Sequence, residues 1–474
     1  MSTPFTCGRA GIALAALTFT FGAAPVFAAG FQINESSASG LGTAFAGGAA
    51  AAEDATILWS NVAGMSRLRE RQVVGAIHLI KPSIKFKNES SVPATGQALG
   101  GEGGDAGGVN VVPNLYFVAP LGPQWSVGLG LNSPFGLVTE YDDNWIGRFQ
   151  AIKSSIKTIN VNPAVAWRPM PRVGVGLGLN FQRIDAEFTN KVNYSGALLA
   201  AAAPLVPGTI SPATLAAIAQ ATAGLESRAS VEGSDNAWGW NAGVLWELDA
   251  KTRAGAHYRS SIEYKIHGDV KFTNPTPAAT GNAALDTVVA QLATGVNTNP
   301  AGLSNTAITS DVKLPAILNL SYFATLNDRW DVMLDAQWTQ WSTIQTLRFV
   351  RANGTDLSST PENFKDTWKV AIGAHYRYNS AWLLRGGVAF DQSPVPNLDR
   401  TPRLPDADRT WLALGARYRI SPDLTFDAGA AYVLVKKAAI DNSGNPASSA
   451  ANARLAGHYN SNTLIASGQV TYAF

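Results

Sequence analysis

The chain has 474 residues, of which 15% are charged, and its formal net charge is +2. The charged fraction is low beside the roughly 25% of soluble proteins, and a chain this close to neutral is not expected to bind nucleic acid. One cysteine excludes an internal disulfide, and the five histidines show neither metal-ligand spacing nor a Ser-His partner motif. We therefore expect no metal, no cofactor and no enzymatic activity.

Residues 1–28 have the pattern of a secretory signal peptide. Arg9 supplies a basic region, residues 10–21 are apolar, and Val26-Phe27-Ala28 places small residues at the −3 and −1 positions of a cleavage site. After this segment no window reaches 18 consecutive apolar residues, so no helical membrane span is expected. The exported protein is then either a soluble periplasmic or secreted protein, or a membrane β-barrel.

Residues 29–68 show neither strand alternation nor a helical stripe, and Gly, Ala and Ser predominate. A flexible tail could have this composition. Small residues also permit close backbone packing, and Gly permits irregular turns. We favour a plug, or hatch, entering from the side of the short turns, because the segment contains anchors that a linker would not need: Phe31, Ile33, Leu41, Phe45, Ile57, Leu58 and Trp59.

From residue 69 onward the sequence repeatedly alternates with a period of two. Within 329–339, one face carries Trp330, Val332, Leu334, Ala336 and Trp338, and the other face is more polar. The same pattern recurs in residues 368–376, 410–420 and 424–434. This period is typical of strands with one apolar face, although a soluble sandwich would share it.

The links between these strands favour a barrel over a sandwich. We count about fourteen segments, and their links alternate between short and long, as in outer-membrane barrels. The short links are LGPQ, RPMPR, LDAKT, TLND, YNS and SPD, and the long ones include residues 193–234, 273–310 and 392–407. Only a closed sheet satisfies every backbone group within hydrocarbon.

The last residues, ASGQVTYAF, put Phe474, Tyr472 and Val470 on one face and resemble the carboxy-terminal assembly signature of outer-membrane barrels. We predict an all-β membrane protein, a 14-stranded antiparallel transmembrane β-barrel formed by residues 69–474, with the N-terminal hatch inside the lumen. Its predicted location is the outer membrane of a Gram-negative cell.

Two of the long outer loops are unusually apolar, with helices expected near residues 211–224 and 282–294. Ser211 is a suitable N-cap and Pro212 a suitable first residue. Exposed apolar surface of this kind marks a binding site or mutual packing of the loops. The candidate capture residues are Leu215, Ile218, Leu285, Val288, Val289 and Leu292.

Several motifs resemble the long-chain fatty-acid transporter family (FadL/TodX type) over essentially the whole mature chain. They are Phe31-Gln32-Ile33-Asn34-Glu35, Ser39-Gly40-Leu41-Gly42, Ala52-Glu53-Asp54-Ala55, Asn61-Val62-Ala63-Gly64-Met65, PFGLVTEYDDNWIGRF, KTINVNP and TPRLPDADRTWLALG. The resemblance implies passive uptake of hydrophobic compounds such as long-chain fatty acids or aromatic hydrocarbons. The resemblance implies that outer loops capture the compound, that an inner apolar pocket then binds it, and that it leaves laterally through a kinked third strand.

The resemblance also implies functional residues and partners. The strand kink is expected at Gly128, Gly130 and Asn132. The hatch and gate residues are expected to be Phe31, Asn34, Asn61, Val62 and Ala63, with Val62 where the family usually has Pro. The expected partners are a hydrophobic small molecule, outer-membrane lipid or lipopolysaccharide, and the barrel assembly machinery, for a protein acting as a monomer.

Inside the barrel we expect Ile317 and Phe323 to line an apolar pocket and Arg377 and Arg417 to bind a carboxylate, with Lys369 as a further basic candidate. Pairing of these basic groups with Asp427 or Asp335 is the alternative. A general diffusion porin for small hydrophilic solutes is the rival function, and the sequence leaves the choice of hydrophobic substrate open.

Overall fold

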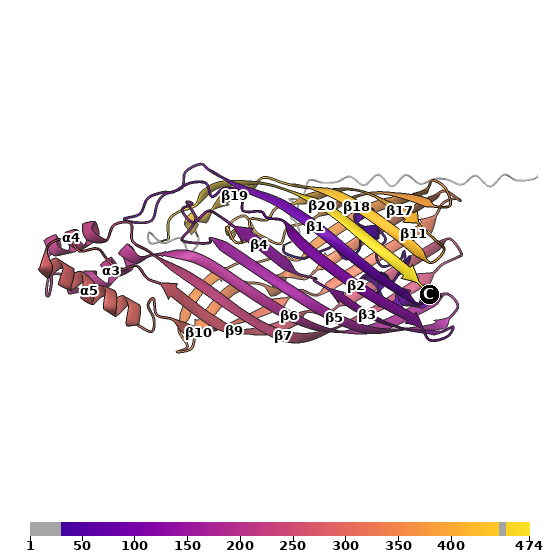
Figure 1. Ribbon diagram of the computed structural model, residues 1–474, viewed down its shortest axis with the longest axis horizontal. Coiled ribbons are helices and arrows are strands. Elements are labelled where there is room, and N and C mark those ends of the chain that lie inside the picture. The colour runs from indigo at the N-terminus through magenta and orange to yellow at the C-terminus, as the bar shows by residue number, and fades with distance from the viewer. Residues whose placement is uncertain (1–29, 445–451) are drawn as a thin grey trace, which may run out of the picture.

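The computed structural model describes residues 30–444 and 452–474, and the signal peptide expected at residues 1–28 lies outside them. Twenty strands form one antiparallel sheet, which closes because β1 (Gln72–Asn88) pairs with both β2 (Asn110–Pro120) and β20 (Ala456–Ala473). Within the described ranges, six wall strands are each interrupted once, so the twenty segments make a closed barrel of fourteen strands (Figure 1). The predicted fold class is confirmed.

The other strands follow in chain order. They are β3 (Trp125–Asn132), β4 (Gly136–Glu140), β5 (Lys153–Met170), β6 (Val173–Asn193), β7 (Glu226–Glu247), β8 (Thr252–Arg259), β9 (Ile262–Thr273), β10 (Thr306–Leu314), β11 (Ile317–Thr325), β12 (Trp330–Thr339), β13 (Thr346–Arg351), β14 (Asp356–Pro361), β15 (Thr367–Arg377), β16 (Trp382–Asp391), β17 (Arg409–Arg419), β18 (Leu424–Val435) and β19 (Ala438–Asp441).

The two faces of the wall differ as the alternation predicted. On β12, Trp330 and Leu334 point outward and are exposed, whereas Asp331 and Met333 point inward and are buried. The same alternation runs along β15, β17, β18 and β20. An apolar outer face is what a bilayer requires, because lipid tails offer no hydrogen-bond partners.

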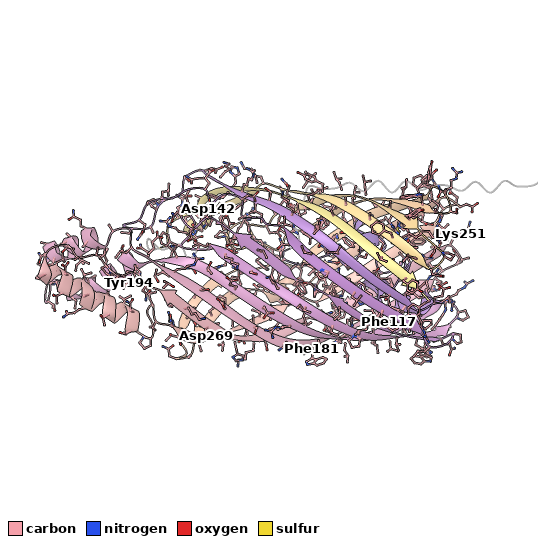
Figure 2. All side chains as sticks on the ribbon, viewed as in Figure 1. Phe117, Asp142, Phe181, Tyr194, Lys251 and Asp269 are labelled. Carbon is pink, nitrogen blue, oxygen red and sulfur yellow. The ribbon has the colours of Figure 1, made fainter. Side chains whose placement is uncertain are left out.

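The two ends of the barrel differ in length and content. At one end the strands are joined by short turns, such as the turn containing Lys251 between β7 and β8. At the other end β6 and β7 extend far beyond the wall and carry the helices α3 (Tyr194–Ala202) and α4 (Pro212–Thr222). The helix α5 (Ala283–Thr298), between β9 and β10, lies beside them (Figures 1 and 2). Strand β7 begins at Glu226, eight residues before the sequence pattern suggested. No helix in 30–444 or 452–474 is long and apolar enough to cross a membrane.

Residues 30–68, the lumenal segment, lie inside the barrel. They contain α1 (Ala38–Leu41), α2 (Ile57–Ser60) and the 3₁₀ helix η1 (Val62–Arg67). Leu41, Leu58 and Met65 are fully buried and pack with inward wall residues such as Tyr116 in the main apolar core. The core of this protein therefore lies between the lumenal segment and the wall.

The path of the lumenal segment differs from the expected entry at the short turns. The Gly30 amide donates a hydrogen bond of 2.8 Å to Asp406, which lies just before β17 at the long-loop end. Near the short turns, Arg67 forms an ion pair of 3.1 Å with Glu247 at the end of β7. The segment thus begins in the outer half of the lumen and runs toward the short turns. Sequence order alone could not reveal this direction.

Glycines on the inner wall make room for the lumenal segment. A Cβ atom at Gly255 would lie 1.9 Å from the Ala49 carbonyl oxygen, and one at Gly176 would lie 2.7 Å from the Ala63 nitrogen. The absence of a side chain lets two backbones approach closely. The alternating glycines of the wall strands therefore form a seat for the segment.

The strand interruption predicted at Gly128, Gly130 and Asn132 lies further along the chain. Those three residues are in β3, which pairs regularly with β5, and the break falls at residues 133–135. A Cβ at Gly128 would lie 2.4 Å from Leu58 Cδ1. These glycines therefore accommodate the lumenal segment, and the residues between the two parts of the interrupted strand are Ser133, Pro134 and Phe135.

Candidate functional site

The three outer helices form an apolar cluster beyond the wall. All six candidate capture residues lie in it, together with residues of α3 such as Leu199. Ile218 and Val289 are buried in its centre, and the partly buried members surround them: Leu215, Leu285, Val288 and Leu292. The structure thus brings the predicted residues together through mutual packing, and the partly buried members provide the accessible apolar surface.

An apolar cavity, the inner pocket, lies between the long-loop end of the wall and the lumenal segment. Its volume is about 90 Å³. Its lining comes mainly from β5, β6, β10 and β13 and from the loop before β17, and includes Phe31, Ile184, Phe188, Leu314, Leu347, Phe349 and Leu404. A mainly apolar lining with a few polar groups is typical of ligand sites.

Four charged residues line the inner pocket: Asp311, which is exposed, Lys313, which pairs with Glu263, and the buried Glu362 and Arg403. The Arg403 guanidinium lies 5.2 Å from the Phe188 ring centre and 3.3 Å from Ser154 Oγ, and no ion pair of the described residues includes it. Burial raises the pKa of Glu362 to about 8, against a smaller opposing effect of Arg403. Glu362 is therefore mainly neutral at pH 7 and leaves the positive charge of Arg403 unbalanced.

A larger cavity of about 730 Å³, the side cavity, connects the lumen to the outer wall. Its lumenal lining includes Trp411 and Val433, and its outer lining includes Val111 and Ile159, which are 56% and 60% exposed. It lies where β2 and β4 are not paired: β2 pairs with β3 only from Leu115 onward. The interruption in the third wall strand therefore produces an opening through the side of the barrel.

The broken strand pairs with the lumenal segment in place of β2. Ile33 donates to the Pro134 carbonyl at 2.9 Å, and Gly136 donates to the Phe31 carbonyl at 3.0 Å. Backbone groups within a membrane barrel need such partners. The start of the lumenal segment thus covers the strand break.

Phe31 lies between the inner pocket and the side cavity and lines both, as do Leu137, Ile156 and Leu404. Its ring meets those of Phe135 and Trp341 edge-to-face, at centroid distances of 5.9 and 5.0 Å. Aromatic pairs at these distances are favourable. Among the expected gate residues, Phe31 is therefore the one located between two cavities.

The other expected gate residues hold the lumenal segment in shape. Asn34 lines a third, more polar cavity of about 100 Å³ beside the segment. The Asn61 side chain donates to the carbonyls of Ala49 and Val244 at 2.7 and 2.9 Å and accepts from the Ala63 amide. Val62 and Ala63 are fully buried, and Asn61 caps the 3₁₀ helix that they begin.

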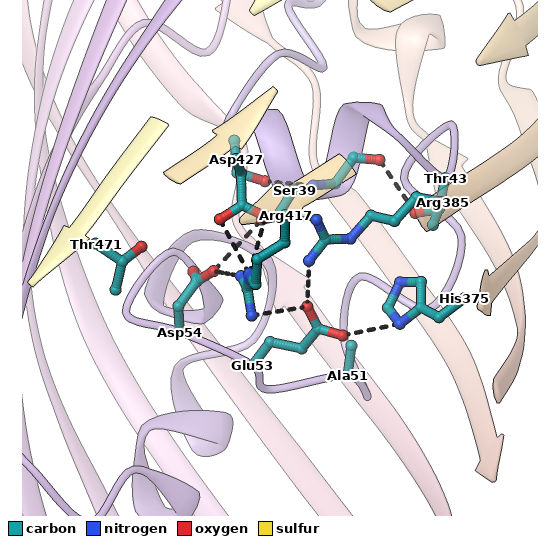
Figure 3. Close-up of polar contacts among 12 residues, drawn as sticks. Ser39, Thr43, Ala51, Glu53, Asp54, His375, Arg385, Arg417, Asp427 and Thr471 are labelled. Atoms are coloured by element: carbon teal, nitrogen blue, oxygen red, sulfur yellow. Dashed lines mark hydrogen bonds and ion pairs between the residues drawn. The ribbon is translucent and has the colours of Figure 1, made fainter. Parts of the chain in front are cut away.

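Six charged side chains join the lumenal segment to the wall (Figure 3): Glu53, Asp54, His375, Arg385, Arg417 and Asp427. Glu53 lies 2.8 Å from Arg385 and 3.0 Å from His375, and Asp54 lies 2.8 Å from Arg417. Burial by itself would raise the pKa of Glu53, but His375 and the two arginines hold it well below its usual value. We call this set the hatch ion network.

The expected carboxylate-binding arginines are therefore engaged. Arg417 pairs with Asp427 at 2.9 Å, and Arg377 pairs with Asp331 at 2.5 Å. Both arginines are thus paired with carboxylates of the wall, as the alternative interpretation expected, although Asp335 is not one of the partners. Lys369 lies over the rings of Phe45 and Trp411.

The two expected apolar lumen residues are both buried but are not brought together. Ile317 packs in the cluster of Phe31 and Trp341, and Phe323 packs in the main core under the Arg253 guanidinium, 3.9 Å from its ring centre. Sequence reasoning missed Arg403 as the unpaired cation. The stretch TPRLPDADRT contained the signal, because Arg403, Asp406 and Asp408 belong to the loop before β17 and Arg409 begins that strand.

A closed sheet with an apolar exterior, a filled lumen and ligand-sized cavities defines the class: a β-barrel transport protein of the Gram-negative outer membrane. A family model described as "Outer membrane protein transport protein (OMPP1/FadL/TodX)" matches residues 19–474. The chain belongs to this family, whose members are transport proteins and not enzymes.

Relatives and solved structures agree. The "Long-chain fatty acid transport protein" of Escherichia coli (strain K12) is 30% identical over 443 residues, covering 91% of this chain and 92% of the relative. The "47 kDa outer membrane protein" of Pasteurella multocida (strain Pm70) is 34% identical, covering 91% and 93%. The crystal structure of a Pseudomonas aeruginosa FadL homologue matches with a TM-score of 0.80 and 25% identity, covering 94% of this chain and all of that chain. The Pseudomonas putida toluene transporter TodX matches with a TM-score of 0.60 and 18% identity, covering 89% and 94%, which shows the shared fold.

Proposed function

We propose that this protein takes up long-chain amphiphiles carrying a carboxylate, such as long-chain fatty acids, passively across the outer membrane. The observation that carries the proposal is the unpaired Arg403 in an otherwise mainly apolar inner pocket. A neutral hydrocarbon needs no cation, whereas a carboxylate gains a charge-assisted hydrogen bond from a guanidinium. The name of the Escherichia coli relative supports this substrate class.

The route has three steps. The apolar cluster of α4 and α5 captures the ligand through Leu215, Leu285, Val288 and Leu292. The ligand then enters the inner pocket, with its carboxylate at Arg403 and its chain against Phe188 and Phe349. Movement of Phe31 joins the inner pocket to the side cavity, from which the ligand enters the bilayer laterally.

In this proposal the lumenal segment, residues 30–68, is a hatch that keeps the barrel closed to ions while residues 69–474 form the wall. The packing of Leu41, Leu58 and Met65 against the wall supports the role of a closure. The hatch ion network, anchored at Glu53 and Asp54, supports it further. A general diffusion porin would instead need an open, water-filled lumen.

The test combines planar-bilayer conductance with uptake of labelled oleate and labelled toluene by cells that produce the protein. We expect low conductance, oleate uptake well above that of toluene, and a large rise in conductance when residues 30–64 are deleted. Large, steady conductance of the intact protein without uptake of oleate would favour the porin.

A further inference from the structure

One lysine lines the side cavity and a second lies beside it on the outer face, and neither has a carboxylate partner. Lys157 of β5 lines the cavity and is exposed. Lys81 of β1 is exposed on the outer face, between Ile80 and Pro82, which both line the same cavity. Among the ion pairs formed by residues 30–444 and 452–474, none includes either lysine. The two cations approach the mouth from strands on opposite sides of the gap.

Both lysines lie at or above the outer edge of the apolar band. Val161 of β5 is level with Phe181, which is level with the exposed Trp238. Lys157 is four residues beyond Val161 toward the long loops, about 13 Å of strand. Aromatic rings of this kind mark the membrane–water interface, so Lys157 reaches the depth of the lipid head groups.

Lys81 occupies a similar level. It pairs in register with Leu464, which in turn pairs with the exposed Tyr432 of β18. Tyrosine is enriched at the same interface. Lys81 therefore lies at the aromatic level, and the apolar outer lining of the cavity, Val111 and Ile159, lies two residues nearer the short turns than the lysines.

The inner part of the side cavity offers no comparable free cation. Arg409 is paired with Asp406 at 2.8 Å and also donates to the Gly30 carbonyl. Glu35 is buried, and burial raises its pKa. Of the charged residues that line the cavity, Lys157 is therefore the one that combines exposure with a lack of an ion-pair partner in the described chain.

We propose that Lys81 and Lys157 receive the carboxylate of an acidic amphiphile after its hydrocarbon chain has passed through the side cavity into the outer leaflet. The ligand leaves chain first, and its carboxylate then moves from Arg403 to the lysines at head-group depth. The two lysines thereby select acidic over neutral long-chain compounds at the exit. This inference rests on the proposed function and names its exit residues.

The test uses cells that lack their own transporter of this kind and that produce the full-length chain or its variants. Uptake of labelled oleate is compared with uptake of labelled oleyl alcohol, which has the same chain without the charge. The double variant Lys81→Gln/Lys157→Gln is compared with Lys265→Gln, an exposed outward lysine of β9 whose ammonium has no ion pair among the described residues. Heat-modifiable gel mobility checks that each variant is folded.

We expect the double variant to slow oleate uptake roughly three- to tenfold, as the loss of two exposed ion pairs implies, and to leave oleyl alcohol uptake unchanged. Lys265→Gln should change the uptake of neither compound. Equal slowing of both compounds, or no slowing of oleate in a protein that does transport it, would overturn the inference alone. Absence of any oleate uptake by the unaltered protein would overturn the proposed function and this inference with it.

A phosphate of lipid A offers a similar anionic group, so binding of lipid A to the purified protein in a non-ionic detergent forms a second arm. We expect the double variant to bind lipid A as the unaltered protein does. If the double variant lost lipid A binding but took up oleate and oleyl alcohol as the unaltered protein does, the lysines would be assigned to a lipid phosphate. That result would overturn the inference.

Discussion

The Glu53 carboxylate of the lumenal segment lies 2.8 Å from the Arg385 guanidinium of β16. Arg385 also pairs with Asp427 of β18, and the side chains of both are fully buried. Glu53 of the lumenal segment therefore pairs with the buried Arg385, which is 332 positions away in sequence. Removing one partner of such a pair leaves an uncompensated charge in the interior.

The first prediction concerns this anchorage. Glu53→Gln combined with Asp54→Asn should loosen the lumenal segment and lower the free energy of unfolding by about 3–5 kcal/mol, the range for breaking buried ion pairs. Planar-bilayer recordings should show more frequent openings. The matched control is Glu102→Gln, which removes the exposed pair with Lys87 and should change neither quantity. Closed, unaltered channels in the double variant would contradict the anchoring role.

The same network predicts how conductance depends on pH. Because the folded-state pKa of Glu53 is depressed below its usual 4.5, its stabilising contribution is fully present above that value. The contribution is lost only as the pH falls through the lower folded-state pKa. Conductance of the unaltered protein should therefore stay low and constant between about pH 5 and 7, where Glu53 is ionised, and rise in stronger acid. A rise between pH 7 and 6 would show that another group controls closure.

A third prediction uses the glycine seat. Gly255→Ala would place a Cβ 1.9 Å from the Ala49 carbonyl oxygen, and neither backbone can move without disturbing the wall. We expect the free energy of unfolding to fall by about 1–3 kcal/mol, as for other overpacked sites. We also expect protease to cleave residues 30–68 more readily. Gly75→Ala, on a strand position with nothing within 4 Å, should behave as the unaltered protein in thermal unfolding and digestion.

The inner pocket gives a fourth prediction. As the pH rises from 7 to 9, Glu362 ionises, since its pKa is about 8. Its new negative charge offsets the positive charge of Arg403. Affinity for oleate, measured by fluorescence titration in a non-ionic detergent, should therefore fall over this range. Glu362→Gln should abolish the dependence while retaining binding. Arg403→Gln should weaken binding about tenfold or more at pH 7, because hydrogen bonds to charged groups are worth about 1.5–3 kcal/mol.

A fifth prediction concerns the separation of the two cavities. Phe31→Ala removes the ring between the inner pocket and the side cavity, so oleate uptake should become faster and its binding weaker. Phe45→Ala is the control, since Phe45 also belongs to the lumenal segment but packs on Trp411. Equal effects of both substitutions would indicate general loosening of the segment.

Much of the fold could be read from the sequence because its physical cause is local. Alternation along β12 and β17 follows from a wall with lipid on one side and the lumen on the other, and the structure has the predicted facing. The outer helices were predictable from the cap at Ser211 and from apolar spacing. The position of the strand break was not, because Gly128 and Gly130 resemble kink residues but serve close packing against Leu58.

Residue types and spacing by themselves determined that this chain forms a barrel with a small-residue segment before it, since period-two alternation and the order of short and long links are properties of neighbouring residues. Only the tertiary structure decided which charges remain free. Arg417 and Arg403 look alike in sequence, but Arg417 meets Asp427 across the β17–β18 hairpin and Asp54 from the lumenal segment. Arg403 instead faces an apolar pocket beside a neutral Glu362. Asp54 lies 363 residues from Arg417 in sequence, and no local pattern specifies that the two meet.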